Sequence, residues 1–104
     1  MALWDRKHFD HMTGADRAMQ VEVLGLFRTQ VEGWRPLLNG AADWRDMVHT
    51  LKGSARGIGL FDLAEACERA ETASVGGVDA ALEAVRTALD AAMCELDRFA
   101  AEAA

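Results

Sequence analysis

The strongest constraint on the fold is an apolar repeat with helical spacing near the C-terminus. Its residues follow one another at alternating steps of four and three: Val78, Leu82, Val85, Leu89, Ala92, Leu96 and Phe99. Such a repeat places one narrow apolar stripe along an α-helix. Asp79 and Glu83 fall in its first turns, where negative charge suits the helix dipole. We therefore expect a long amphipathic helix that packs against other helices.

Three earlier segments have the same kind of spacing. Segment 15–38 has Met19, Val23, Leu26, Phe27, Trp34 and Leu37, and Pro36 should kink or end this helix. Segment 43–58 has Trp44, Met47, Val48, Leu51, Ala55 and Ile58. Segment 61–73 has Leu63, Ala64, Cys67 and Ala70, and a short helix is expected over about residues 3–12. Breaks are expected at Asn39-Gly40, at Gly57 and Gly59, and at 74–77.

Composition agrees with a helical protein. The chain has 104 residues, one proline and no tyrosine, and β-branched residues are scattered among alanines and leucines. This length fits one domain. We predict an all-α fold, an antiparallel up-down four-helix bundle with a short additional N-terminal helix, in a single domain spanning residues 1–104.

Charge and cysteine content narrow the class of function. The net charge of −6 argues against non-specific nucleic-acid binding, which needs a broad cationic surface. No segment has the roughly 20 apolar residues that a membrane-spanning helix needs. Cys67 and Cys94 form no metal-ligand motif, and we interpret both as buried core residues of a protein in a reducing cytoplasm.

The helix predicted over 43–58 carries an unusual polar face. At about 100° per residue, His49 lies about 150° from the centre of the apolar stripe, so it should face solvent near the middle of the helix. Arg45, Lys52 and Arg56 lie at −4, +3 and +7 from His49 and share its face. This acidic protein therefore groups three cations around one exposed imidazole.

Gly53 is locally unfavourable in this helix. A glycine inside a helix costs about 1 kcal/mol relative to alanine, and this one lies off the apolar stripe. The missing side chain beside His49 would let another molecule approach the ring closely. The alternative is a tolerated, neutral glycine.

Residues 49–60 read His-Thr-Leu-Lys-Gly-Ser-Ala-Arg-Gly-Ile-Gly-Leu. This stretch resembles the signature of histidine-containing phosphotransfer (Hpt) domains: a histidine, any residue, Leu-Lys-Gly-Ser-Ser/Ala, and a glycine six residues beyond the first. Leu26-Phe27 and residues 63–71 resemble the flanking helices of the family. The resemblance implies that His49 accepts a phosphoryl group from the aspartyl phosphate of a receiver domain and passes it to another. It also implies that Lys52 assists the phosphoryl group, Gly53 gives the partner access, and Gly59 permits the turn out of the helix.

In several Hpt proteins a Glu or Gln on the next helix contacts the imidazole, and Glu71 occupies that place here, with Glu68 as the alternative. Glu71 continues the stripe of Leu60, Ala64 and Cys67, so it should lie near the bundle seam. The alternative is a solvated carboxylate at the end of a helix. The implied partners are receiver domains of response regulators or hybrid histidine kinases. We expect a monomeric, cytoplasmic phosphocarrier that is not an enzyme, needs no cofactor or metal, and binds neither nucleic acid nor membrane.

The sequence allows three other interpretations. A non-catalytic helical interaction module would explain the apolar stripes but has no use for an exposed histidine beside lysine and glycine. His8 and His11 can share one helical face as metal ligands, but no second ligand pair is evident. The chain can also be the phosphoacceptor domain of a longer chemotaxis-type kinase, since its own sequence has no glycine-rich nucleotide loop.

Overall fold

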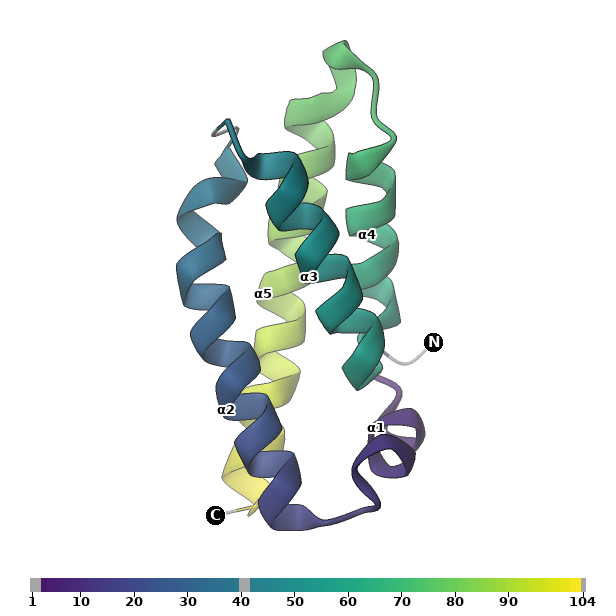
Figure 1. Ribbon diagram of the computed structural model, residues 1–104, viewed down its shortest axis with the longest axis vertical. Coiled ribbons are helices and arrows are strands. Elements are labelled where there is room, and N and C mark those ends of the chain that lie inside the picture. The colour runs from purple at the N-terminus through teal and green to yellow at the C-terminus, as the bar shows by residue number, and fades with distance from the viewer. Residues whose placement is uncertain (1–2, 40–41, 104) are drawn as a thin grey trace.

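A computed structural model describes residues 3–39 and 42–103 (Figure 1). Its elements are α1 (Arg6–Thr13), α2 (Arg17–Trp34), the 3-10 helix η1 (Arg35–Asn39), α3 (Trp44–Ile58), α4 (Phe61–Glu71), the 3-10 helix η2 (Val75–Gly77) and α5 (Val78–Ala103). These residues include no β-strand, so the prediction of an all-α fold is confirmed. Among the helices of the described ranges, none combines the length and the apolar character that spanning a membrane requires.

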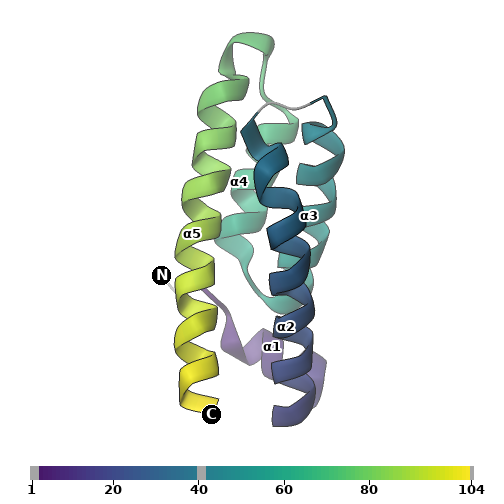
Figure 2. The ribbon, with the colours of Figure 1, turned by 90° about the vertical axis from the view of Figure 1, so that its left-hand side faces the viewer.

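Helices α2, α3, α4 and α5 run side by side in alternating directions along the long axis of the molecule (Figures 1 and 2). The short helix α1 lies at the end of the bundle where α2 begins and α3 ends. This is the predicted up-down four-helix bundle with an additional N-terminal helix. Because α3 and α4 form one antiparallel hairpin, residues near the start of α3 lie beside the end of α4.

The core is built from the stripes predicted for α3 and α5. Val48, Leu51, Ala55 and Ile58 of α3 are buried. In α5 the repeat from Leu82 to Phe99 is buried, and Val78 packs partly buried at its edge. The amphipathic pattern of these two helices therefore predicts their orientation correctly.

The apolar face predicted for α2 is wrong at two positions. Phe27 and Trp34 are buried as expected, but Met19 and Leu26 are exposed. The helix instead buries Gln20, Leu24 and Val31. A buried glutamine is tolerated because its Nε2 atom donates to Asp10 Oδ1 at 2.7 Å and to Thr13 Oγ1 at 3.0 Å. Both acceptors belong to α1. Contacts with another helix therefore help to decide which side of α2 is buried.

Proline and glycine end the helices where the sequence indicates. α2 stops at Trp34, two residues before Pro36, and continues as η1. Asn39 ends η1, and Gly40 lies outside the described residues. At the end of α3, Gly59 has a φ of +90°, which favours glycine.

The N-terminal segment covers the end of α3. The backbone N–H of Asp5 donates to the carbonyl of Gly59 at 2.9 Å, and the indole Nε1 of Trp4 donates to the carbonyl of Ile58 at 2.8 Å. A Cβ atom at Gly59 would lie 2.5 Å from the backbone oxygen of Asp5. Glycine is therefore required here for its backbone conformation and for the close approach of another segment.

The two cysteines differ, and the prediction that both are buried is wrong for Cys94. Cys67 is buried on α4, and this burial raises the pKa of its thiol to about 12. Cys94 is exposed on α5. At about 100° per residue it lies on the opposite side of α5 from Leu89, Ala92 and Leu96.

Candidate functional site

His49 lies in the middle of α3 on the side opposite the core. Its neighbours Val48 and Leu51 are fully buried, whereas the His49 side chain is 69% exposed. The exposure expected from the helical pattern is therefore present. A histidine in this setting is accessible to a large partner.

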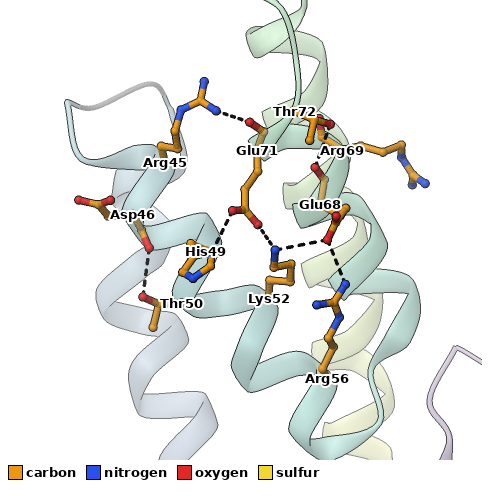
Figure 3. Close-up of polar contacts among 10 residues, drawn as sticks. All are labelled: Arg45, Asp46, His49, Thr50, Lys52, Arg56, Glu68, Arg69, Glu71 and Thr72. Carbon is orange, nitrogen blue, oxygen red and sulfur yellow. Dashed lines mark hydrogen bonds and ion pairs between the residues drawn. The ribbon is translucent and has the colours of Figure 1, made fainter.

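Glu71, the last residue of α4, holds one edge of the imidazole (Figure 3). Its Oε2 atom lies 2.9 Å from His49 Nδ1, and its side chain is only 20% exposed. A carboxylate accepts hydrogen bonds, so this contact favours the tautomer that carries its proton on Nδ1. The lone pair of the imidazole then lies on Nε2.

Lys52 holds the same carboxylate from the other side. Its Nζ atom lies 2.5 Å from Glu71 Oε1 and 3.3 Å from Glu68 Oε2, and its side chain is 14% exposed. The Lys52 ammonium lowers the pKa values of Glu71 and Glu68, and hydrogen bonding to Glu71 raises the pKa of Lys52. The three groups therefore stay charged together at neutral pH.

The cations predicted to surround His49 are present, but carboxylates from α4 pair with two of them. Arg56 Nη2 lies 3.0 Å from Glu68 Oε2, and Lys52 bridges both glutamates. The guanidinium of Arg45 donates to the backbone carbonyl of Glu71. The sequence showed the cations because they share a helix face with His49. Their pairing requires α4 to lie alongside, which helical periodicity within α3 does not reveal.

The choice between Glu71 and Glu68 follows from their positions on α4. Glu71 contacts His49 and Lys52, whereas Glu68 contacts Lys52 and Arg56. Only Glu71 therefore contacts the imidazole directly, and Glu68 belongs to the surrounding ion pairs. Figure 3 shows the resulting chain of contacts from Arg45 to Arg56.

Comparison with known proteins places this arrangement in a family. The Hpt domain model matches residues 22–99, well over half of the chain. The chain is also similar to the crystal structure of the histidine phosphotransferase ShpA from Caulobacter crescentus, with 43% sequence identity and a TM-score of 0.86 over 97% of this chain and 93% of that one. The chain belongs to the Hpt domain family. It is a histidine phosphotransfer protein of the phosphorelay type. Comparison with curated proteins gave no match.

The Hpt match contains the whole polar cluster around His49 and leaves α1 outside. This division agrees with the structure, since α1 lies at the end of the bundle and contributes no residue to the cluster. Its polar contacts instead hold Gln20 near the start of α2, and Trp4, just before α1, binds the end of α3.

Gly53 of this Hpt protein is exposed, and a Cβ atom at this position would meet nothing within 4 Å. No packing contact therefore explains glycine at this position. It lies one turn after His49 on the same surface, where it leaves the approach to the ring open.

His8 and His11 lie on α1, away from this cluster. The His8 ring packs edge-on against Phe61, with ring centroids 5.2 Å apart. Within residues 3–39 and 42–103, no three His, Cys, Asp or Glu side chains gather in a way that would hold a metal ion.

Proposed function

We propose that His49 is the phosphoacceptor of this Hpt protein, taking the phosphoryl group of an aspartyl phosphate on a receiver domain and passing it to another receiver. The observation that supports this most is the exposed His49 ring, whose Nδ1 atom is held by Glu71. It leaves Nε2 as the nucleophile on the solvent side of the helix. The protein acts as a carrier, and we expect it to work as a cytoplasmic monomer.

The transfer needs no cofactor from the Hpt protein. The Nε2 lone pair attacks phosphorus, a P–N bond forms, and the P–O bond to the aspartyl group breaks. The electron pair of that bond returns to the aspartate carboxylate. The imidazole ring becomes cationic while Nδ1 keeps its proton, and the Glu71 carboxylate at 2.9 Å offsets this charge. Return transfer reverses the same steps.

Lys52 has two roles in this proposal. Its ammonium fixes the Glu71 carboxylate at 2.5 Å, so that the hydrogen bond to Nδ1 is already aimed before the partner arrives. It also contacts both glutamates, and it can exchange its longer contact with Glu68 for a phosphoryl oxygen. Arg56 adds positive charge toward the acidic active site of a receiver.

The receiver would dock over His49 and Gly53 and extend onto α2. Val21, Gly25 and Arg28 line a groove that α2 shares with α5, so Met19 and Leu26 lie on the other side of α2, toward α3. α2 ends at Trp34 and the antiparallel α3 begins at Trp44, so Leu26 lies about level with Lys52. Leu26 is an exposed apolar side chain on this side of α2, which suits a transient partner that must also release.

A transfer experiment tests the proposal. Incubation with a phosphorylated receiver should give an adduct on this protein that is labile in acid and stable in base. His49→Gln should abolish the adduct, whereas His8→Gln and His11→Gln should leave it unchanged. These are the three histidines of the chain, so the variants serve as matched controls. Absence of an adduct on the wild type, or an undiminished one on His49→Gln, would overturn the proposal.

A further inference from the structure

Arg45 lies one turn before His49, yet its guanidinium turns away from the ring toward the end of α4 (Figure 3). It donates a hydrogen bond to the backbone carbonyl of Glu71. The guanidinium also lies over the Trp44 ring, 4.5 Å from its centroid. Arg45 is thus held between its own helix and the last residue of the neighbouring one.

The carbonyl that Arg45 binds has no partner within its own helix. Glu71 ends α4, and the last four carbonyls of a helix lack an intrahelical donor. The three carbonyls before it accept hydrogen bonds from Thr72 and Ala73, whereas the Glu71 carbonyl accepts one from Arg45. A cation is also favourable at the C-terminal end of a helix. Arg45 therefore caps α4 from the adjacent helix.

Glu71 is held at three atoms: Oε2 by His49, Oε1 by Lys52 and its backbone oxygen by Arg45. The last turn of a helix frays readily, and fraying here would carry the carboxylate away from the ring. We propose that Arg45 is a positioning residue that acts through Glu71, by fixing the last turn of α4 so that the carboxylate stays on His49 Nδ1. The inference rests on the proposed function of His49. It gives Arg45 a different role from that of a cation acting directly on the phosphoryl group.

Nitrogen NMR of the unphosphorylated protein tests the positioning step alone. In the wild type the two imidazole nitrogens of His49 should have distinct shifts, one protonated and one free. Arg45→Met should bring these shifts toward each other as the two tautomers mix. Arg69→Met is the matched control, because Arg69 is an arginine near the end of α4 whose side chain points away from His49 in Figure 3. Wild-type shifts in Arg45→Met would overturn the inference.

A double-variant experiment tests whether Arg45 acts through Glu71. Arg45→Met should slow phosphoryl uptake about threefold to tenfold, the size expected for the loss of one ordinary, solvent-exposed hydrogen bond. Glu71→Ala removes the carboxylate and keeps the backbone carbonyl, so adding Arg45→Met to it should cause no further loss of rate. An equal further loss would show that Arg45 acts directly on the partner, contrary to the inference.

The two experiments separate the inference from the function on which it rests. If neither the wild type nor any variant accepts phosphate, the role proposed for His49 is wrong. The NMR comparison then still decides the role of Arg45. Thermal unfolding of each variant, followed by circular dichroism, checks that a changed rate does not come from loss of the folded state.

Discussion

Replacing Gly59 by alanine should destabilise the protein strongly, although it adds only one methyl group. A non-glycine residue in the left-handed region costs about 1–2 kcal/mol. The added Cβ would also lie 2.5 Å from the backbone oxygen of Asp5, so the N-terminal segment must move. That movement weakens two hydrogen bonds, from Asp5 to Gly59 and from Trp4 to Ile58, each worth about 1 kcal/mol.

Together these losses amount to about 2–4 kcal/mol, a large part of the roughly 5–15 kcal/mol that stabilises a typical domain. The melting temperature should fall by at least about 8 °C, measured by far-ultraviolet circular dichroism. Gly57→Ala is the matched control. Gly57 lies in α3 with nothing within 4 Å of its added Cβ, so this variant should gain about 0.5–1 kcal/mol. If Gly59→Ala melts no lower than Gly57→Ala, the account of this turn is wrong.

Further predictions concern the polar cluster and the cysteines. Gly53→Ala should raise stability by about 0.5–1 kcal/mol and yet slow uptake from a receiver, and wild-type uptake would contradict the clearance role. Lys52 lowers the pKa values of the Glu71 and Glu68 carboxyl groups in the folded protein. The ionised carboxylates therefore stabilise the fold at pH values above their ordinary pKa of 4.5, and this stabilisation is lost as the pH falls through the lowered pKa values of the folded state. Glu71→Gln should therefore flatten the fall in melting temperature below pH 4.5, and an unchanged slope would refute this. A thiol reagent should modify Cys94 in the native protein and reach Cys67, whose pKa is about 12, only after unfolding, and two reactive thiols in the native state would contradict the burial of Cys67.

The parts of the structure that follow from periodicity within one helix could be predicted from the sequence. The stripes of α3 and α5 are narrow, so they determine which side is buried and place His49 in solvent. The turn at Gly59 follows from its position after the last residue of α3. The dense Hpt motif added the expected roles of Lys52 and Glu71, and the structure places Glu71 against the imidazole and Lys52 against Glu71.

The parts that depend on contacts between elements could not be predicted in the same way. α2 has apolar residues on several sides, and the burial of Gln20 rather than Met19 depends on hydrogen bonds to α1. The paired state of Lys52 and Arg56 depends on how α3 and α4 are aligned. One feature of the predicted fold points to the contact of Arg45 with the Glu71 backbone, because in an up-down bundle the start of α3 must lie near the end of α4.

The helical hairpin of α3 and α4 contains the whole polar cluster, from Arg45 to Glu71. The two helices are joined by a short turn and share the most extensive contact of any pair among the described elements. Closing so short a loop costs little chain entropy. The contacts between α3 and α4 are therefore local in sequence, the type of contact that favours fast folding. The alignment of His49 with its carboxylate is therefore a local property of one hairpin. α2 and α5 complete its core, and changes on the exposed face of α2 can alter the proposed docking surface while this alignment is kept.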